Sequence, residues 1–166
     1  MERLAWDEYF MSYAQLASTR STCVRRQIGA VLVKDNFIIS TGYNGSPTGQ
    51  EHCIDKGCVR DKLHIESGIR TEMCMAVHAE ANCIIQAANK GRSIVGATLY
   101  TTAFPCSYCA RMLANSGIVA IWYLGDYPDA LAKNIIECAD MLVVRYADKY
   151  ADEPLRNAIG HIRLAR

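Results

Sequence analysis

Apolar residues recur at helical spacing near the start of the chain. Trp6, Phe10 and Tyr13 would share one side of a helix, and polar residues separate them. Two short runs rich in β-branched residues follow, at 28–33 and 37–42. Because only three polar residues stand between these runs, the pattern predicts a helix followed by a β-hairpin.

Helices and strands are predicted to alternate in the second half of the chain. Gly91 and Gly117 suit helix C-termini, and Pro128 suits a helix start. This alternation is typical of a buried sheet with helices on both faces. We therefore expect residues 1–166 to form a single three-layer α/β/α domain around a central mixed sheet. The predicted helices span 79–91, 106–117 and 128–139, and the predicted strands span 96–102, 118–124 and 141–146.

Between about residues 43 and 75 the sequence has no regular period. Gly45, Pro47 and Gly57 are among the residues that interrupt it. Compact domains rarely tolerate so much irregular chain without a function or a stabilising crosslink. We expect a long loop or insertion here, and a polar, helical tail from about residue 148.

Overall charge and hydropathy argue against several classes of partner. The formal net charge is +1, so no broad field attracts nucleic acid or an anionic membrane. No apolar run approaches the length of a membrane span. The first predicted helix is amphipathic and lacks the continuous apolar segment of a signal peptide. We expect a cytoplasmic protein without nucleic-acid or membrane partners.

The chain holds eight cysteines, which in the absence of an export signal favours metal binding or catalysis over disulfides. Cys83 and Cys138 fall in apolar helical patterns, which favours small buried side chains. Cys106 and Cys109 are three residues apart, directly after a proline. Taken alone, this pair fits a redox couple, half of a disulfide framework or two metal ligands.

His78 and Glu80, upstream of the pair, favour the metal. Both begin a predicted helix, and Cys106 and Cys109 begin the next one. One histidine and two cysteines supply three ligands to a zinc ion that keeps its fourth position open. The order H-x-E…P-C-x-x-C is the signature of zinc deaminases that act on nucleobases. A redox pair would leave His78 and Glu80 unexplained.

This signature implies hydrolytic deamination of a cytosine ring. The zinc would supply hydroxide near neutral pH to attack C4 of the ring. Glu80 would take the water proton, pass a proton to ring N3 and later protonate the departing amino group. The backbone amides near Ala79 are expected to hydrogen-bond the base.

Beyond the zinc signature, the chain from about residue 6 to residue 127 resembles the deoxycytidylate (dCMP) deaminase family, including its late-competence-operon relatives. The matching stretches include "WDEYFM", "STCVRRQIGAV", "STGYNGSPTG", "VHAEANCII" and "PCSYCA". "GYNG" discriminates best, because tRNA adenosine deaminases and guanine deaminases share the zinc motif without it. The resemblance implies a cytidine deaminase-like fold and conversion of dCMP to dUMP for thymidylate synthesis.

The resemblance also implies roles for residues outside the zinc motif. Asn44 of "GYNG" would hydrogen-bond the deoxyribose or its phosphate side, and Tyr127 would contact the nucleotide. Arg25 or Arg26 would neutralise the phosphate. The alternatives are a left-handed turn residue for Asn44, packing for Tyr127 and surface charge for the arginines.

Family members are typically homo-oligomers, often hexamers. Many are activated by dCTP and inhibited by dTTP with a magnesium ion. No motif in this chain marks the residues responsible, so dCTP, dTTP and Mg²⁺ are expected at the level of the family alone.

A second group of potential ligands lies in the irregular segment and just before the first strand. Some family members hold a structural zinc with cysteines at positions that match Cys23 and Cys53. A closed Cys/His site would stabilise an irregular loop. The alternative is a set of unligated thiols and loop histidines. The preferred ligands are Cys23, Cys53 and Cys74, with His64, Cys58 or His52 as the fourth.

Three other functions are compatible with this fold. The protein could deaminate another cytosine nucleotide or nucleoside, edit nucleic acid, or serve as a competence-linked protein that keeps zinc as a scaffold. The near-neutral charge argues against a nucleic-acid editor. Glu80 argues against a scaffold, because a structural zinc does not need that carboxylate.

Overall fold

The computed structural model describes residues 3–149, and five strands in this part of the chain form one sheet. Its order is β2-β1-β3-β4-β5. β1 runs antiparallel to β2 and β3, whereas β3, β4 and β5 are parallel. The predicted mixed sheet is therefore confirmed. The strands are β1 (Gly29–Lys34), β2 (Phe37–Tyr43), β3 (Thr98–Ala103), β4 (Ala120–Gly125) and β5 (Leu142–Arg145).

The predicted β-hairpin joins β1 to β2. Asp35 and Asn36 form its turn with φ angles of 51° and 61°. Two successive left-handed residues are what a two-residue type I′ turn requires, and its twist matches that of the strands. Lys34 pairs with Phe37 on either side of the turn.

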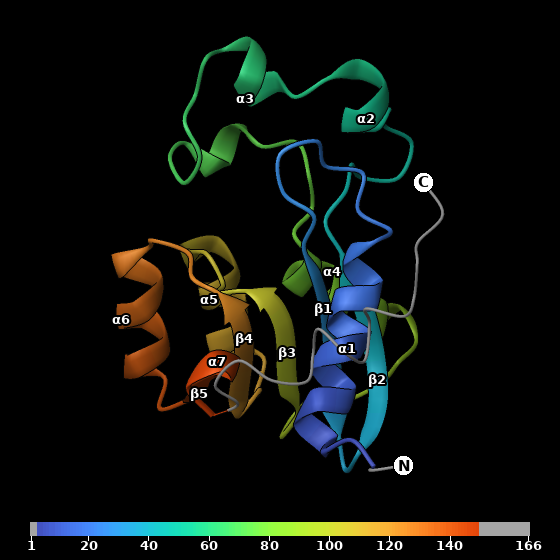
Figure 1. Cartoon of the computed structure of the whole chain (residues 1–166), viewed down its shortest axis with the longest axis vertical. Coiled ribbons are helices and arrows are strands. Elements are labelled where there is room, and N and C mark those ends of the chain that lie inside the picture. The colour runs from blue at the N-terminus through green and yellow to red at the C-terminus, as the bar shows by residue number, and fades with distance from the viewer. Residues whose placement is uncertain (1–2, 150–166) are drawn as a thin grey trace.

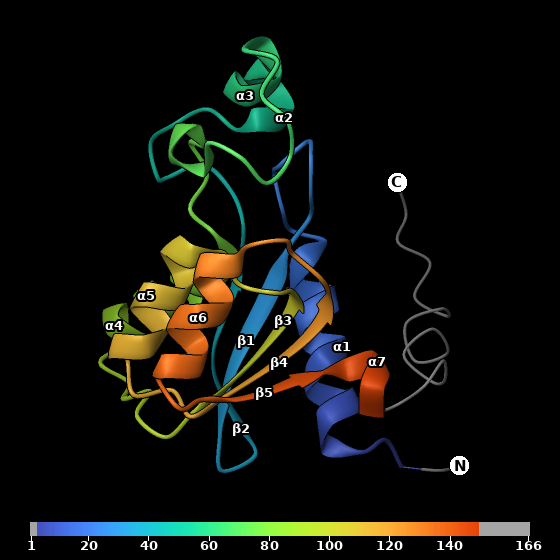
Figure 2. The same cartoon turned by 90° about the vertical axis from the view of Figure 1, so that its left-hand side faces the viewer.

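Helices cover both faces of the sheet (Figures 1 and 2). α1 (Trp6–Ser18) and the short α7 (Tyr146–Lys149) lie on one face. α4 (Ala79–Asn89), α5 (Ser107–Asn115) and α6 (Ala130–Cys138) lie on the other. This arrangement is the predicted three-layer α/β/α architecture.

Each face has its own apolar cluster. Leu99, Leu113 and Ile121 belong to the cluster beneath α4, α5 and α6. Phe10 and Trp122 belong to the cluster beneath α1. Burial of these side chains supplies the main favourable term in folding.

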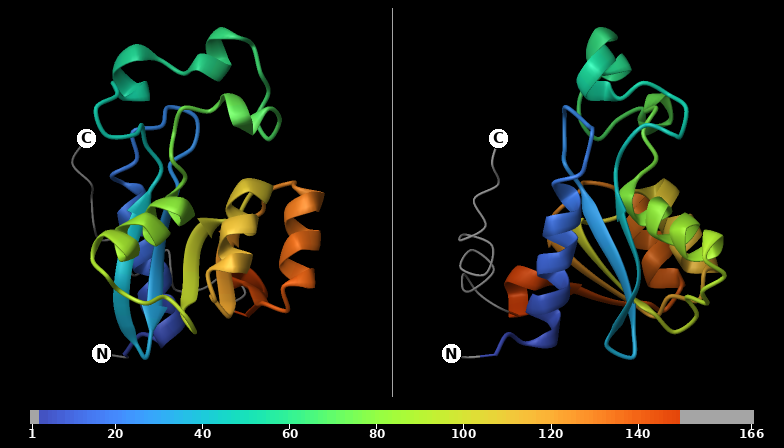
Figure 3. Two further views of the ribbon diagram at one scale, coloured as in Figure 1. Left: turned by 180° about the vertical axis from the view of Figure 1, so that it is seen from behind. Right: turned by 90° about the vertical axis from the view of Figure 1, so that its right-hand side faces the viewer.

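The region between β2 and α4 stands beyond one end of the sheet (Figure 3). Gly45 and Val77 close its base through two backbone hydrogen bonds of 3.1 and 2.8 Å. We call the enclosed residues 46–76 the cap segment. The expected irregular loop thus contains short helical turns: α2 (Cys53–Lys56), α3 (Val59–Lys62) and the 3₁₀ turn η1 (Thr71–Met73).

Arg60 anchors part of the cap segment from inside. The side chain is buried, at 8% exposure. Its Nη2 donates to the carbonyl oxygens of Glu66 and Ile69, at 2.7 and 2.6 Å. The guanidinium therefore stabilises the turn that contains Glu66 and Ile69 through hydrogen bonds, in a segment with few buried apolar side chains.

Some local predictions need correction. Cys83 is buried as predicted, but Cys138 is exposed, because α6 turns Ala132 and Ile136 toward the core instead. The last predicted strand ends one residue early, since Tyr146 begins α7. The predicted helical tail beyond α7 lies outside the described residues. No helix between residues 3 and 149 combines the length and apolar character that a bilayer span requires.

Candidate active site

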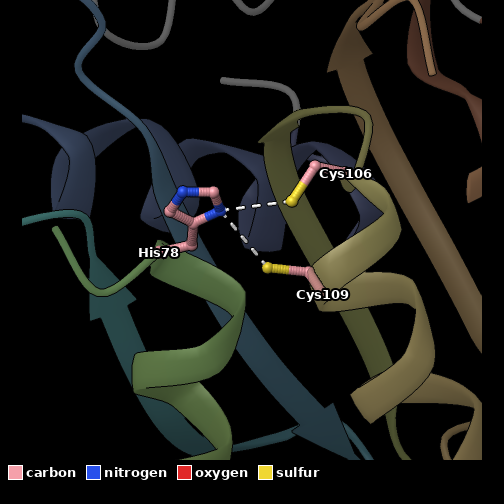
Figure 4. Close-up of side chains that lie close together, drawn as sticks. All are labelled: His78, Cys106 and Cys109. Carbon is pink, nitrogen blue, oxygen red and sulfur yellow. Dashed lines mark hydrogen bonds between the residues drawn. The ribbon is translucent and has the colours of Figure 1, made fainter. Parts of the chain in front are cut away.

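Two helix N-termini bring His78, Cys106 and Cys109 together (Figure 4). His78 is the N-cap of α4, and Cys106 is the N-cap of α5. The Nδ1 of His78 lies 3.3 Å from the Sγ of Cys106 and 3.5 Å from the Sγ of Cys109. Within the described part of the chain, this is the one group of three His, Cys, Asp or Glu donors whose ligand atoms all lie within 4.8 Å.

These separations fit a zinc ion. Zn–N bonds of about 2.0–2.1 Å and Zn–S bonds of about 2.3 Å at tetrahedral angles separate nitrogen from sulfur by about 3.5 Å. The distances from His78 Nδ1 to the two sulfurs match that value. Cys106 is 5% exposed and Cys109 is fully buried. Three convergent nitrogen and sulfur donors therefore suit zinc with a fourth position open.

The chain that leaves β3 leads directly to Cys106 and Cys109 at the start of α5. The backbone N–H of Phe104 donates to the carbonyl of Gly125 at 2.8 Å, and its ring packs edge-on against Tyr123. Pro105 is fully buried and leads directly into α5. The end of the sheet thus fixes where α5 begins.

β2 positions the histidine. A Cβ at Gly42 would lie 2.1 Å from the carbonyl oxygen of Ala79, so β2 and α4 touch where no side chain fits. The hydroxyl of Ser40 donates to the carbonyl of Cys83 at 2.8 Å, and Asn82 Nδ2 donates to the carbonyl of Tyr43 at 2.7 Å. The first turn of α4 is therefore held against the strand.

Hydrogen bonds shift the pKa values of the three donors. The Cys109 contact, followed by the His78 contact, lowers the pKa of Cys106 to about 4 despite burial. The same contact with Cys106, together with burial, raises the pKa of Cys109. Contacts with Cys106 and then Cys74 raise the pKa of His78 to about 11. The site stabilises a thiolate, which is the form that binds metal.

Glu80 lies on the wall of the same cavity as His78 and Cys106. Its side chain is 4% exposed. Burial raises the pKa of its carboxyl, and His78 opposes this shift. A buried carboxyl of raised pKa, next to a metal site, is suited to accept and return a proton.

Residues from distant parts of the sequence also line the cavity. Arg25, Arg26, Asn44 and Tyr127 all line it. Together with Ala79, every residue that is predicted to contact the nucleotide thus lines the cavity that His78, Glu80 and Cys106 also line. Their contact with a nucleotide stays a prediction.

Asn44 is buried and tied to the segment before β1. Its Oδ1 accepts from Ser21 Oγ at 2.6 Å and from the N–H of Ile28 at 2.8 Å, and its Nδ2 donates to the carbonyl of Arg26 at 2.8 Å. Its φ is not positive, so the left-handed turn alternative does not hold. Asn44 therefore orders the backbone that bears the predicted phosphate ligands.

The arginines and Tyr127 form one wall of the cavity. The guanidinium of Arg26 lies 5.6 Å from the ring centre of Tyr127. Arg25 Nε lies 3.4 Å from Asp61 Oδ1, and Arg25 Nη1 is buried without a hydrogen-bond partner. Burial raises the pKa of Tyr127, and the nearby Cys106 raises it further.

Four cysteines of the predicted second zinc site line this cavity as well. Cys23, Cys53, Cys58 and Cys74 all face it. Burial, followed by the nearby Cys23, raises the pKa of Cys53. A hydrogen bond with His78 lowers the pKa of Cys74. No three of these four sulfurs lie within 4.8 Å of one another, so the structure does not bring them together as it does the His78 group, and a structural zinc on these thiols stays a prediction.

The two candidate histidines occupy different positions. His52 and His64 are exposed, and neither lines the cavity that the four cysteines share. His64 adopts a left-handed φ of 53° at the end of a short helix. Cys58, which is 7% exposed, is thus better placed than either histidine to be the fourth ligand.

Arg60 and Asp129 have contacts that the sequence does not predict. Arg60 lines the cavity, and its Nε is buried without a hydrogen-bond partner. Asp129 accepts a hydrogen bond from the backbone N–H of Ser107, the residue after Cys106. An acidic residue after Pro128 is a helix-start signal, but no sequence pattern shows contacts between distant segments.

Comparison with known proteins identifies the family. A family model described as the cytidine and deoxycytidylate deaminase zinc-binding region matches residues 4–125. The chain belongs to this family. Among deaminase-family relatives, the chain is 41% identical over 128 residues to the deoxycytidylate deaminase of Mycobacterium phage D29, covering 74% of this chain and 97% of the phage protein. It is 39% identical over 127 residues to ComE operon protein 2 of Bacillus subtilis, covering 76% of this chain and 63% of the relative.

A solved structure in the same family supports the fold. The crystal structure of dCMP deaminase from the cyanophage S-TIM5, in complex with dCMP and dUMP, matches with a TM-score of 0.73 and 27% identity. The match covers 87% of this chain and 99% of the phage chain. The predicted cytidine deaminase-like fold is confirmed. The chain nevertheless spans less than two thirds of the Bacillus protein.

Proposed function

We propose that this protein is a zinc-dependent deaminase that hydrolyses dCMP to dUMP and ammonia. One observation carries the proposal: His78, Cys106 and Cys109 converge, and His78 and Cys106 share the wall of one cavity with the buried carboxyl of Glu80. Family membership and the similarity to phage dCMP deaminases support the choice of substrate.

The protein's own groups would divide the reaction between them. His78 Nδ1 and the sulfurs of Cys106 and Cys109 would hold zinc. When bound, zinc lowers the pKa of a water molecule. Glu80 would accept a proton from that water and place one on N3 of the cytosine ring. The oxygen of that water would form a bond to C4, and Glu80 would then move the remaining hydroxyl proton to the amino group, so that the C4–N bond breaks and ammonia leaves.

The first turn of α4 would also orient the base. The first N–H groups of a helix have no acceptor within it. Ala79 is the first residue of α4 and lies between His78 and Glu80. Its N–H is therefore proposed to hydrogen-bond the pyrimidine.

Charge on the cavity wall supports a 5′-monophosphate. Arg25, Arg26 and Arg60 line the cavity, and two of them have buried N–H groups without partners. Guanidinium N–H groups suit phosphate oxygens in number and geometry. Asn44 would fix the backbone beneath these arginines, and Tyr127 would pack against the nucleotide.

Ammonia release from a panel of substrates tests the function. The panel contains dCMP, CMP, deoxycytidine, dCTP and a cytosine-containing oligonucleotide. We expect the highest kcat/KM with dCMP. Preference for deoxycytidine would overturn the phosphate assignment, and preference for the oligonucleotide would indicate a nucleic-acid editor. Absence of turnover in the zinc-loaded protein would favour a competence-linked role without catalysis.

We also propose a structural zinc between the cap segment and the residues before β1. Its ligands would be Cys23, Cys53, Cys58 and Cys74. Their shared cavity and the small number of buried residues in the cap support this site. Metal analysis should find two zinc ions per chain, and one in the Cys53→Ser variant. One ion in both proteins would contradict the second site.

The remaining proposals concern the oligomeric state of the protein, its cellular compartment and its regulation. We propose a single-domain chain that forms a homo-oligomer, most simply a hexamer, in the cytoplasm. Exposed apolar residues on α1, among them Trp6, Tyr9 and Leu16, support self-association, and eight unpaired cysteines suit a reducing compartment. Light scattering should give six chains per particle; a monomer would contradict this.

Activation by dCTP and inhibition by dTTP, both with Mg²⁺, would be measured on dCMP turnover.

A further inference from the structure

The helix that bears two of the zinc ligands lacks a cap of its own. Cys106 occupies the N-cap position of α5, but its side chain makes no capping hydrogen bond. Its sulfur faces His78 instead. A helix N-terminus leaves backbone N–H groups that need acceptors. In α5, the residue that would normally supply the acceptor is committed to the metal site.

Asp129 provides an acceptor from the neighbouring helix. Its Oδ2 accepts from the backbone N–H of Ser107, the first residue of α5, at 2.8 Å. Its Oδ1 accepts from the N–H of Ala132, in the first turn of α6, at 3.0 Å. One carboxylate therefore caps two helices, and one of its bonds lies a single peptide unit from Cys106.

The carboxylate is held in its charged form by these contacts. Burial favours the neutral form, but the N–H groups of Ala132 and Ser107 outweigh it and lower the pKa of Asp129. Asp129 also follows closely after Tyr127, whose carbonyl accepts the N–H of Asp129 at 2.9 Å. The same residue thus links α5, α6 and the loop that bears Tyr127.

We propose that Asp129 is a positioning residue for the zinc site. Through Ser107 it fixes the Cys106–Cys109 turn against α6, so that both sulfurs stay within reach of His78 Nδ1. This inference rests on the proposed zinc site. Partners that orient metal ligands typically affect metal affinity by about 10- to 100-fold.

Two substitutions break the cross-helix bond in different ways. Asp129→Ser keeps a good N-cap for α6, but the shorter side chain cannot also reach α5. Ser107→Pro removes the N–H donor itself. Proline is well tolerated at the first position of a helix, and the extended backbone of Cys106, at φ −75° and ψ 167°, suits a residue that precedes proline. Asp126→Ser is the matched control, since Asp126 is exposed and pairs with Arg145.

Zinc transfer to a chromophoric chelator provides the main measurement. We expect about ten-fold faster release from Asp129→Ser and from Ser107→Pro than from wild type, and wild-type release from Asp126→Ser. With Co²⁺ in place of zinc, the thiolate charge-transfer bands should shift in the first two variants. Because both changes remove the same bond, the double variant should release zinc no faster than the more affected single variant.

The outcomes separate this inference from the proposed function. Wild-type release rates and unshifted Co²⁺ spectra in both variants would overturn the role of Asp129, while zinc-dependent turnover would leave the function intact. Additive effects in the double variant would also overturn it. If the wild-type protein binds no zinc, that result contradicts the proposed zinc site itself and not only the role of Asp129. Circular dichroism identifies a misfolded variant, and the second substitution then supplies the test.

Discussion

Glu80 is a carboxyl in an environment that opposes its charge. It is 4% exposed and lies in the first turn of α4, two residues after the predicted zinc ligand His78. Burial raises its pKa, whereas His78 lowers it. The net effect is a raised pKa, which favours a carboxyl that takes a proton and later returns it. Purely structural carboxyls are seldom placed so deeply without a bound cation or a full set of donors.

Replacement of Glu80 by glutamine should abolish proton transfer and keep the shape of the site. We expect kcat for dCMP to fall by at least about 10²-fold, with zinc content unchanged by metal analysis. Glu72→Gln, at an exposed position on the cap segment, is the control and should retain wild-type turnover. Turnover within two-fold of wild type in Glu80→Gln would contradict the proton-transfer role.

Asp129 should make stability depend on pH in a defined direction. Its pKa in the folded protein is lowered, relative to about 3.9 for an unfolded aspartate. Its stabilisation is therefore present above about pH 4 and is lost as the pH falls through the folded pKa. We expect Asp129→Asn to be less stable than wild type at pH 6, with a difference that shrinks below pH 4. Urea unfolding between pH 6 and pH 3 measures this; a constant difference would contradict it.

At the scale of elements, the site depends on how closely α4 approaches β2. Gly42 permits this approach, since a Cβ there would lie 2.1 Å from the carbonyl of Ala79 and 2.8 Å from the N–H nitrogen of Cys83. Both neighbours are backbone atoms, which cannot rotate away. The side chain of Ser40 and that of Asn82 add hydrogen bonds on either side of the contact. A single hydrogen atom at Gly42 therefore helps set the position of His78.

Gly42→Ala should push α4 away from the sheet. We expect the free energy of unfolding to fall by about 1–3 kcal/mol, the usual effect of overpacking, and zinc affinity to fall with it. Gly125→Ala is a suitable control because its Cβ would make an ordinary contact of 3.5 Å with Thr102. Chemical denaturation and zinc titration provide the measurements. Equal losses in both variants would show that the close approach has no special role.

At the scale of the molecule, the cavity is lined by two parts of the chain that differ in how much apolar surface they bury. The sheet and its helices have two apolar clusters. The cap segment buries few apolar side chains, among them Cys53, Cys58 and Ile65. The Gly45–Val77 bridge closes the cap one residue before His78. Loss of order in the cap would therefore act directly on the zinc site and on the arginines near it.

Removal of zinc should loosen the cap before the sheet. We expect amide hydrogen exchange to accelerate in residues 46–76 of the chelated protein, while β1 and β3 stay protected, because core strands open only on global unfolding. Cys53→Ser with its catalytic zinc retained should show the same local effect. Exchange that accelerates equally in cap and sheet, or in neither, would contradict a metal-stabilised cap.

The sequence by itself determined the features that depend on local spacing. The period of α1, the hairpin between β1 and β2, and the alternation of helices with strands follow from neighbouring residues. The order of His78, Glu80, Cys106 and Cys109 belongs here too, since each pair occupies one helical turn. These signals depend on residues close together in the sequence, so they can be recognised without knowledge of the fold.

Only the tertiary structure decided which distant groups meet. Asn44 binds the segment from Ser21 to Ile28, and Asp129 caps a helix that begins at Ser107. The exposure of Cys138 likewise depends on which side of α6 faces the sheet. Such contacts arise from the packing of whole elements, whose relative positions no short stretch of sequence records. The candidate zinc ligands and the carboxyl of Glu80 could therefore be predicted from the sequence, whereas the contacts that hold them in place depend on packing.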